Sequence, residues 1–374
     1  MHKLLLVLLA FPLLIVGSPT NAPDASRAPA TEAIQAPSGG KSPGTVSTAT
    51  AVPAASIQDD ALGPAEATGQ PVLTFSVLSD IHVEASDKDS QRKLSAALTD
   101  LHAVNPKADA LIINGDLTNG MPADYSKLQS LLDKAPLPDD VWFTIGNHEF
   151  YKAWMDDTGN YRKSAFPNNE TDAASIERFL QFTGGDKLYY ARTIRDHRFI
   201  FLGSEQYRQS NPNNGEDAYL SQAQLDWLNR ELKQAAGSQA ADQPIFVFLH
   251  QPLPYTVAGS QYYLNTRAVI QHEQLKSILT QYPQVFFFSG HTHWELKLPN
   301  TLVRDGFTMI NSSSVDEPLT DHGPEGEKPA GPDESEGLYV EVYDDRVEIK
   351  GRDFHRQRWI PEAQFVIPTG PQKR

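Results

Sequence analysis

The chain has 374 residues, of which 40% are hydrophobic and 21% charged, a balance typical of a folded globular protein. Its formal net charge of −15 at pH 7 offers no electrostatic basis for binding a nucleic acid polymer or an anionic membrane surface. The absence of cysteine excludes disulfides, thiolate metal ligands and cysteine nucleophiles.

Residues 1–22 have the layout of a secretory signal peptide. A basic start precedes an apolar run at 4–16, which is too short to span a bilayer comfortably, and small residues follow it. We therefore expect a secreted or extracytoplasmic protein with no stable membrane span after the signal is removed. Residues 23–70 are rich in Pro, Ala, Ser and Thr and poor in large apolar side chains, which predicts a disordered linker. The folded domain is then 71–374.

Short apolar runs alternate with amphipathic stretches throughout the folded domain. The expected strands are 72–79, 110–114, 141–145, 199–203, 245–249, 285–289 and 307–311. The expected helices are 90–104, 123–134, 175–182, 221–236 and 271–281, the fourth opening with a capping box at Ser221 and Gln224. Segments 338–343 and 346–350 predict a hairpin. This order of elements predicts an α/β domain with a mixed sheet.

Five of the expected strands are each followed by aspartate, histidine or asparagine. In chain order the groups are Asp80-Ile81-His82, Gly115-Asp116, Gly146-Asn147-His148-Glu149, His250 and Gly290-His291-Thr292-His293. The glycines are expected to allow sharp turns. Ligands of open α/β sheets bind beyond the carboxyl ends of the strands, so these groups should converge on one crevice. One such group has an ordinary explanation as turn residues, but five in succession indicate a site.

The chemistry of these side chains indicates two metal ions. The candidate ligands are carboxylate oxygens, one amide oxygen and imidazole nitrogens: Asp80, His82, Asp116, Asn147, His250, His291 and His293. An oxygen and nitrogen set without sulfur suits Mn, Fe or Zn better than Mg or Ca. Two ions about 3.5–4 Å apart require a bridging carboxylate, and such a pair generates hydroxide near neutral pH and stabilises an in-line displacement at phosphorus.

In this order the groups resemble the five signature motifs of the calcineurin-like metallophosphoesterases, over residues 80–293. The resemblance implies a four-layer α/β/β/α sandwich of two mixed sheets. The ligands that it implies for a first ion are Asp80, His82, Asp116 and His293, with Asp116 bridging, and those for a second ion are Asn147, His250 and His291. It also implies that His148 is catalytic, because the matching histidine faces the substrate phosphate and protonates or stabilises the leaving oxygen.

Two positions depart from related patterns. Asn119 stands three residues after Asp116, where purple acid phosphatases have a tyrosine, so a ferric charge-transfer centre is not expected. Glu149 replaces an aspartate at the end of the third motif, and we expect it to orient the site without binding metal.

The segments around the motifs leave several interpretations open. Aromatic residues in the insertion at 149–169 suit either stacking of a base or sugar, or packing of a cap on the core. Residues 251–255 are candidates to line the pocket, and Arg267 is a candidate phosphate ligand, although a surface role is favoured. The acidic, Pro- and Gly-rich segment 312–337 is expected to be a solvated loop near the mouth of the cleft.

The function expected is a secreted enzyme that hydrolyses small phosphodiesters by attack of a hydroxide bridging two divalent ions. Within the family, the motif order is most similar to the branch of bacterial cyclic-nucleotide phosphodiesterases and purple acid phosphatase-like enzymes. An extracytoplasmic location argues against a cytoplasmic messenger, which leaves other nucleotide- or lipid-derived phosphoesters open. One alternative is an acid-phosphatase-type phosphomonoesterase. The other is a non-catalytic binding module, which is disfavoured because no expected ligand is missing. The sequence does not indicate the oligomeric state.

Overall fold

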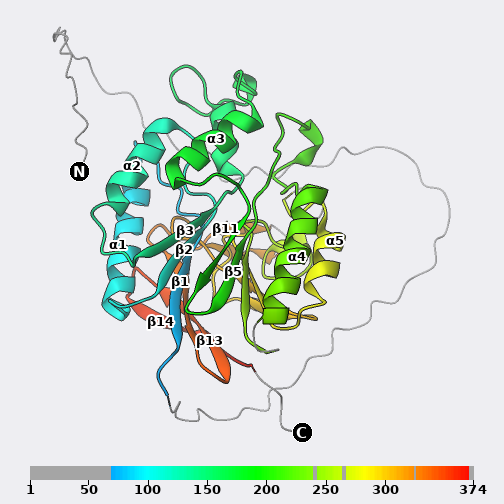
Figure 1. Ribbon diagram of the computed structural model, residues 1–374. Helices are drawn as coiled ribbons and strands as arrows, with labels where there is room; N and C mark the ends of the chain where they lie inside the picture. Colours follow the sequence, from blue (N-terminus) through cyan, green and yellow to red (C-terminus); the bar gives the residue numbers. More distant parts are fainter. Residues whose placement is uncertain (1–68, 239–241, 263–266, 324–325, 370–374) are drawn as a thin grey trace, which may run out of the picture. The chain divides into compact units, whose positions relative to one another are not determined.

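The strands of the folded part form two six-stranded sheets, both of mixed direction. The computed structural model describes residues 69–369 except 239–241, 263–266 and 324–325 (Figure 1). The predicted signal peptide and all but the last two residues of the predicted linker lie outside the described residues. Within the described ranges, no helix has the length and apolar character needed to cross a membrane.

The first sheet has the strand order β14-β13-β12-β1-β2-β3. Its strands are β1 (Leu73–Leu78), β2 (Ala110–Asn114), β3 (Asp140–Thr144), β12 (Glu336–Val342), β13 (Arg346–Asp353) and β14 (Arg358–Pro368). β1, β2 and β3 are parallel, and β12 joins β1 in antiparallel pairing with Phe75 opposite Val340. The expected hairpin is the β12–β13 pair.

The second sheet has the strand order β4-β5-β6-β7-β9-β8. Its strands are β4 (Tyr190–Ile194), β5 (His197–Phe201), β6 (Ile245–Phe248), β7 (Val285–Ser289), β8 (Leu302–Arg304) and β9 (Thr308–Asn311). The four central strands are parallel and the two edge strands are antiparallel to them. A separate two-stranded hairpin consists of β10 (Leu319–Asp321) and β11 (Glu327–Pro329).

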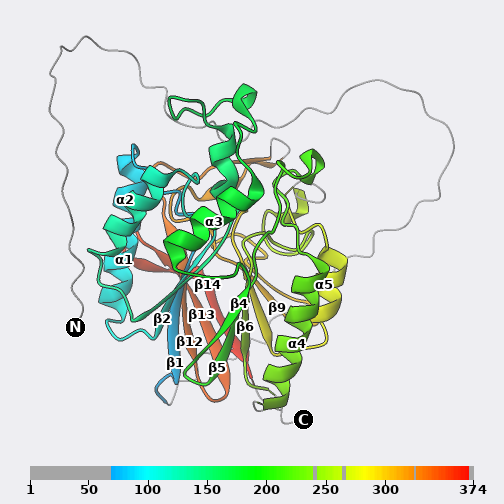
Figure 2. The ribbon, with the colours of Figure 1, turned by 45° about the horizontal axis from the view of Figure 1, so that its top comes forward.

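Helices cover the outer face of each sheet. α1 (Lys88–Val104), α2 (Pro122–Leu132) and α3 (Asp172–Thr183) pack on the first sheet, whereas α4 (Gln222–Ser238) and α5 (His272–Leu279) pack on the second (Figures 1 and 2). Short 3-10 helices span His148–Trp154 (η1), Lys163–Ala165 (η2), Pro212–Asn214 (η3) and Ser260–Tyr262 (η4). The expected four-layer α/β/β/α sandwich is confirmed.

Local capping explains where the helices begin. Asp87 accepts hydrogen bonds from the backbone N–H groups of Asp89 and Ser90 at the start of α1. Ser221 Oγ accepts from the backbone N–H of Gln224 at 3.2 Å, which is the first half of the expected capping box. The second predicted bond, from the Ser221 N–H to the Gln224 side chain, is not formed. Glu205 accepts from the Ser221 N–H, and the Gln224 side chain bonds the backbone of Gly203.

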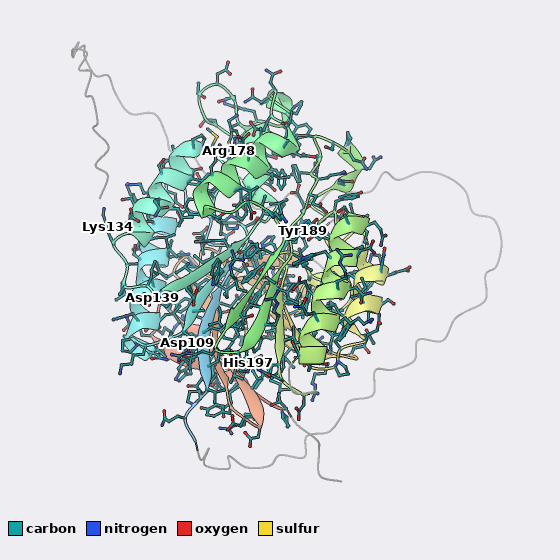
Figure 3. The ribbon with its side chains drawn as sticks, viewed as in Figure 1. Asp109, Lys134, Asp139, Arg178, Tyr189 and His197 are labelled. Carbon is teal, nitrogen blue, oxygen red and sulfur yellow. The ribbon has the colours of Figure 1, made fainter. Side chains whose placement is uncertain are left out.

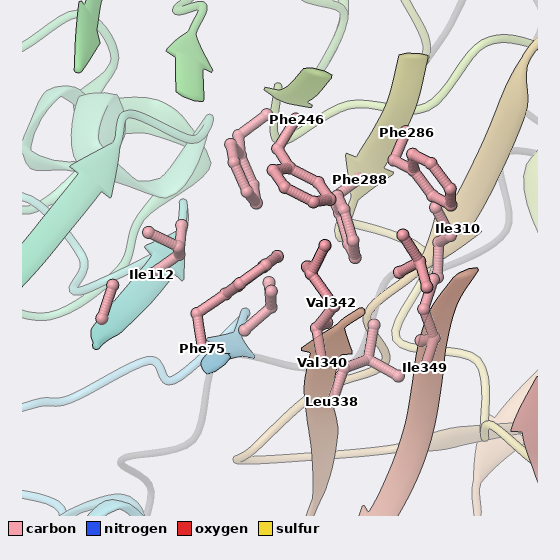
Figure 4. Close-up of a cluster of buried hydrophobic side chains, with 14 of the residues drawn as sticks. Phe75, Ile112, Phe246, Phe286, Phe288, Ile310, Leu338, Val340, Val342 and Ile349 are labelled. Atoms are coloured by element: carbon pink, nitrogen blue, oxygen red, sulfur yellow. The ribbon is translucent and has the colours of Figure 1, made fainter. Parts of the chain in front are cut away.

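The core between the sheets is built around Phe75 on β1. Its ring meets Phe246 and Phe199 edge to face, with centroids 4.9 and 5.0 Å away, and it also contacts Phe248 and Phe288 (Figure 4). All five rings are almost completely buried. Burial of one such side chain stabilises the fold by about 1.5–3 kcal/mol, so this cluster contributes strongly to holding the two sheets together.

Candidate metal centre

The five groups of polar residues lie together where the two sheets meet. They follow β1, β2 and β3 of the first sheet and β6 and β7 of the second. Asn114, the last residue of β2, connects the two sets: its Nδ2 donates to the carbonyls of Leu249 and Phe288, and its Oδ1 accepts from Thr144 Oγ1 at 2.8 Å. The expectation that the strand ends converge is therefore confirmed.

A first group of potential ligand atoms comes from Asp80, His82, Asp116 and His293, all within 4.8 Å of one another. His293 Nε2 lies 2.9 Å from Asp80 Oδ1 and 3.2 Å from His82 Nε2. His82 Nε2 is 3.9 Å from Oδ1 of Asp80 and from Oδ2 of Asp116. The four side chains therefore aim nitrogen and oxygen atoms at one point.

A second group consists of Asp116, His250 and His291, again with ligand atoms within 4.8 Å of one another. His250 Nε2 lies 3.1 Å from Asp116 Oδ2. Asp116 thus belongs to both groups, whereas His291 and His293 fall into different ones. The structure thus brings these residues together in two neighbouring groups that share Asp116.

The residues present fit two bound cations. Asn147 Oδ1 is buried and has no hydrogen-bond partner among the described residues. A buried acceptor without a partner is energetically unfavourable, and a cation would satisfy this oxygen. The donor atoms are oxygen and imidazole nitrogen only, which suits Mn, Fe or Zn.

The electrostatics of the groups are dominated by the two aspartates. Burial opposes protonation of His250, but Asp116 and Asp80 outweigh it and raise its pKa to about 10. Burial likewise opposes protonation of His293, but Asp80 raises its pKa to about 9. Burial works against ionisation of Asp80 and Asp116, yet the facing imidazoles lower both carboxyl pKa values. The centre therefore stabilises positive charge, as a metal site must.

Five of the candidate ligands have a left-handed backbone conformation. Their φ angles are 51° at Asp80, 39° at His82, 50° at Asp116, 67° at His291 and 57° at His293. A residue with a side chain is strained there by about 1–3 kcal/mol, although Asp and His tolerate the region better than most residues. Such strain clusters at functional sites, where the surrounding structure imposes it.

The glycines of two motifs are needed for close packing. A Cβ on Gly290 would lie 1.8 Å from Ser79 Oγ, and one on Gly146 would lie 2.2 Å from Asp116 Oδ1. Neither glycine has a positive φ, so close packing rather than a left-handed backbone requires glycine at these two positions. Only a residue without a side chain lets the loops approach the carboxylates this closely.

Backbone carbonyls set the orientation of two imidazoles. His250 Nδ1 lies 2.8 Å from the carbonyl oxygen of Asn114, and His293 Nδ1 lies 2.9 Å from that of Glu317. A carbonyl only accepts, so each Nδ1 carries the proton and each Nε2 is directed at the ligand group.

The position of Glu317 corrects the expectation of a solvated loop at 312–337. Residues 312–315 are fully buried, and Ser314 Oγ donates to the carbonyl of Asp80 at 2.9 Å. The segment continues into the β10–β11 hairpin, where Leu319 pairs with Trp294. The start of the segment is thus part of the wall of the site, despite its polar composition.

Glu149 organises two of the loops that carry ligands. Its carboxylate is fully buried and accepts from the backbone N–H groups of Asp116, Leu117, Thr118 and Gly146 at 2.7–3.1 Å. Burial, together with the nearby Asp116 charge, raises its pKa to about 8. The hydrogen bonds are those expected of a residue that orients the site without itself binding metal.

His148 lies beside the ligand groups. Its Nδ1 is 2.7 Å from Asn119 Oδ1, while Asn119 Nδ2 donates to Glu84 Oε1 at 2.7 Å. Because the amide nitrogen is used by Glu84, the oxygen faces His148 and accepts its Nδ1 proton. His148 Nε2 is then directed inward, 3.9 Å from Asp116 Oδ2. Burial lowers the pKa of His148.

The aromatic residues of the insertion at 149–169 pack mainly against one another. Tyr151 stacks on His148 with ring centroids 3.8 Å apart, and Trp154 stacks on Phe166 at 4.1 Å. Trp154 also lies against Tyr161 at 5.9 Å. Of the two expectations, these contacts favour packing as a cap.

The insertion is anchored by ion pairs. The buried carboxylate of Glu170 accepts from Lys152 and from Arg178, which lies on α3 (Figure 3). Arg178 Nε donates to the carbonyl of Gly120 at 2.6 Å. Glu170 therefore ties the insertion to α3, and Arg178 ties α3 to the loop that follows Asp116.

The other candidate pocket residues have varied positions. Gln251 is buried and donates to the carbonyl of Glu216, whereas Tyr255 is 65% exposed. Arg267 forms an ion pair with Glu327 of β11 at 3.2 Å, and Glu327 also accepts from Trp294 Nε1. Arg267 thus contacts the hairpin beside the site.

Glu216 is the main residue of the site that sequence reasoning missed. It accepts from Asn147 Nδ2 at 3.0 Å, from the hydroxyls of Tyr151 and Tyr207, and from Arg208. It lies outside every motif and 69 residues from Asn147, so no pattern in the sequence marks it. Glu84 was also missed, although its place two residues after His82 was a signal that it lies nearby.

Comparison with known proteins agrees with the geometry. The model of the calcineurin-like phosphoesterase family matches residues 73–295, and the chain belongs to this family. The fold, the paired ligand groups and the family match define a metallophosphoesterase with a dinuclear centre.

Curated relatives include several phosphodiesterases. The chain is 25% identical to a 3',5'-cyclic-nucleotide phosphodiesterase of Nostoc sp., over 60% of this chain and 73% of the relative. It is 22% identical to the glycerophosphodiester phosphodiesterase GpdQ of Enterobacter lignolyticus, over 52% of this chain and 60% of the relative.

Two solved structures share the fold. A dimetal phosphatase from Danio rerio has a TM-score of 0.57 at 17% identity, covering 80% of this chain and 100% of that chain. A purple acid phosphatase from yellow lupin has a TM-score of 0.52 at 13% identity, covering 79% of this chain and 53% of that chain. These likenesses extend to the fold alone.

Proposed function

We propose that this protein hydrolyses small phosphodiesters outside the cytoplasmic membrane. One observation carries the proposal: Asp116 is shared by the two ligand groups, and His148 Nε2 lies 3.9 Å from its Oδ2. A bridging carboxylate next to a potential proton donor is the arrangement required for attack on phosphorus and departure of an alkoxide or phenoxide.

The ligand roles proposed follow the two groups. Asp80, His82, Asp116 and His293 would hold the first ion. Asp116, His250 and His291, together with the buried Oδ1 of Asn147, would hold the second. When bound, the two ions supply Lewis-acid activation of water and of the phosphoryl group.

The chain's own residues complete the reaction. In its imidazolium form, His148 donates the Nε2 proton to the leaving oxygen, while Asn119 holds the proton on Nδ1. Glu149 holds the loops of Asp116 and Asn147 in place, so both ligands keep their geometry while charge develops on the substrate.

A diester is favoured over a monoester by the charges around the centre. A monoester dianion needs more positive charge than a diester monoanion. Arg208 and Arg267, however, each form an ion pair with a glutamate, Glu216 and Glu327 respectively. The names of the relatives add support, because cyclic-nucleotide and glycerophosphodiester phosphodiesterases both act on diesters. The extracytoplasmic location rests on the apolar run at residues 4–16.

The proposal is tested by comparing two chromogenic substrates. Purified protein loaded with Mn, with Fe or with Zn is assayed on bis-p-nitrophenyl phosphate and on p-nitrophenyl phosphate, and bound metal is counted. We expect two ions per chain and a kcat/KM at least about tenfold higher on the diester, a discrimination worth about 1.4 kcal/mol. A preference for the monoester would indicate a phosphomonoesterase, and two bound ions with no turnover of either ester would indicate a binding module.

The location is tested separately. The full chain with a C-terminal tag, expressed in a bacterium, should be recovered outside the cytoplasm. A variant that lacks residues 2–22 should remain in the cytoplasm. Equal cytoplasmic recovery of both would contradict the proposed export.

A further inference from the structure

The side chain of Glu216 contacts two residues of the candidate centre, the proposed ligand Asn147 and the neighbour of His148, Tyr151. It follows η3 in the chain and is 12% exposed. Its Oε2 accepts from Asn147 Nδ2 at 3.0 Å and from the Tyr151 hydroxyl at 3.2 Å. One oxygen atom thus contacts both a proposed metal ligand and the residue that stacks on His148.

The bond to Asn147 decides which atom of that amide faces the centre. Because Nδ2 donates to Glu216, Oδ1 is the atom turned the other way, and it is buried without a hydrogen-bond partner in the described structure. An amide can bind a cation only through its oxygen. Glu216 therefore holds Asn147 in the orientation that ligation requires.

The bond to Tyr151 acts on His148. The Tyr151 ring lies against the His148 ring at a centroid distance of 3.8 Å and an interplanar angle of 22°. Asn119 fixes the edge of the imidazole that carries Nδ1, and Tyr151 supports one of its faces. Together these two contacts restrain both the rotation and the tilt of the ring.

The carboxylate of Glu216 is itself held firmly. The Tyr207 hydroxyl lies 2.8 Å from both of its oxygens, and Arg208 Nη2 lies 2.9 Å from Oε1. Tyr207 is fully buried, and its hydroxyl also accepts from Trp154 Nε1 at 3.2 Å. Several charge-assisted bonds in one buried network give Glu216 a single position.

We propose that Glu216 is a positioning residue that couples the second metal position, through Asn147, to the proton donor His148, through Tyr151. This inference rests on the proposed phosphoesterase function. In the step concerned, a water oxygen bonds to phosphorus and releases a proton to solvent. The bond from phosphorus to the leaving oxygen breaks, and that oxygen takes the electron pair and the Nε2 proton of the imidazolium form of His148. His148 is left neutral with its proton on Nδ1, and it regains the Nε2 proton from solvent. A misplaced His148 impairs only the transfer to the leaving oxygen.

The dependence of rate on the leaving group separates this role from a general structural one. Protonation of the leaving oxygen matters little for the weakly basic p-nitrophenolate and more for the more basic phenolate. A loss of general acid catalysis therefore lowers kcat mainly for the substrate that releases phenolate. Wild type, Tyr151→Leu, Tyr151→Phe, Glu216→Gln and Glu216→Ala are compared on bis-p-nitrophenyl phosphate and diphenyl phosphate, with bound metal counted for each. Tyr190→Phe is the control, because it removes the hydroxyl of a half-buried tyrosine that bonds the carbonyl and N–H of Phe143, away from the ligand groups.

For Tyr151→Leu we expect two bound ions, and a loss of kcat about tenfold larger on diphenyl phosphate than on bis-p-nitrophenyl phosphate. Tyr151→Phe keeps the ring but loses the hydrogen bond to Glu216, so it should show the same leaving-group effect to a smaller extent. Glu216→Ala should lower metal occupancy from two ions towards one and show the same leaving-group effect, and Glu216→Gln should restore part of both. Tyr190→Phe should match wild type.

Equal losses on the two diesters, with two ions retained in Glu216→Ala, would overturn the inference. If Glu216→Ala does not fold, an equal loss in Tyr151→Leu overturns it, and an unequal loss supports the connection to His148. Failure of the proposed function is distinguishable, since wild type would then bind two ions and hydrolyse neither diester. The metal count in Glu216→Gln would still decide the link to Asn147.

Discussion

Oδ2 of Asp116 lies 3.1 Å from Nε2 of His250, and the same carboxylate also belongs to the ligand group on the other side of the centre. No other residue among the described His, Asp and Glu side chains is common to both groups. One carboxylate therefore decides whether two neighbouring cations are held or none.

Replacement of Asp116 tests this directly. Asp116→Asn removes the negative charge that both ions would share, and we expect the purified variant to retain neither ion after dialysis, measured by elemental analysis. Asp226→Asn, at an exposed aspartate of α4, serves as the control and should keep two. Retention of two ions by Asp116→Asn would show that this residue is not the bridge.

The role of His148 is tested by separating turnover from metal binding. His148→Asn removes the proposed proton donor, and general acid catalysis contributes roughly 10²–10⁴-fold to rate, so kcat on diphenyl phosphate should fall by that order. Metal content should be unchanged, because His148 is not a proposed ligand. His102→Asn, at an exposed histidine of α1, should behave as wild type. Normal turnover of His148→Asn would refute the assignment.

Glu149 should contribute strongly to stability. Glu149→Ala leaves four buried backbone N–H groups without their acceptor, and each unsatisfied donor costs roughly 1–3 kcal/mol. We expect the free energy of unfolding in urea, measured without metal, to fall by about 3 kcal/mol or more. Glu149→Gln keeps one acceptor oxygen and should lose less. A loss below about 1 kcal/mol for Glu149→Ala would contradict the proposed role.

Glu336 should make stability depend on pH. Its side chain is 4% exposed and accepts from Leu296 N–H and Ser313 Oγ, and burial raises its pKa to about 7 from 4.5. Between these values the folded state keeps a proton that the unfolded state releases. The contribution of Glu336 to stability is therefore greatest below pH 4.5 and decreases as the pH rises to 7.

Glu336→Gln cannot ionise and should remove this dependence. Relative to wild type, the variant's free energy of unfolding should rise by on the order of 3 kcal/mol between pH 5 and pH 8. Glu362→Gln, at an exposed glutamate of β14, should show no such change. A constant difference between Glu336→Gln and wild type over this range would disprove the prediction.

The central strands could be predicted because both of their faces are buried. β2 and β7 begin and end where the apolar runs do, since every residue in them is buried. The edge strands β4 and β14 were missed for the opposite reason. Both contain exposed residues and have no continuous apolar run, and β14 contains Pro361. Composition also gave a wrong prediction at 312–315, which is buried. Ser314 Oγ donates to the carbonyl of Asp80 and the Val315 N–H donates to that of Ser79, so the segment packs against the residues that follow β1.

The candidate ligands could be predicted because each directly follows a strand, so chain order alone places it at the sheet edge. The residues that orient those ligands, in contrast, can be identified only from their positions in the folded structure. Glu216 lies between two strands of the second sheet and reaches Asn147 only when the two sheets pack. Glu317 reaches His293 because β9, which precedes it, pairs with β7. Their interactions use a side chain in one case and a backbone carbonyl in the other, so residue type gives little indication of either.

The interdigitation of Phe75 with the rings of the facing sheet has a consequence far from any ligand. Asp80 and Asp116 extend from one sheet and His250, His291 and His293 from the other. The distance between the two sheets would therefore set the separation of the two ions. Metal–ligand bonds tolerate deviations of only about 0.2 Å. A smaller apolar side chain at Phe75, as in Phe75→Leu, would change the distance between the sheets. The site's relative affinity for ions of different radius would then shift, although no ligand has been replaced.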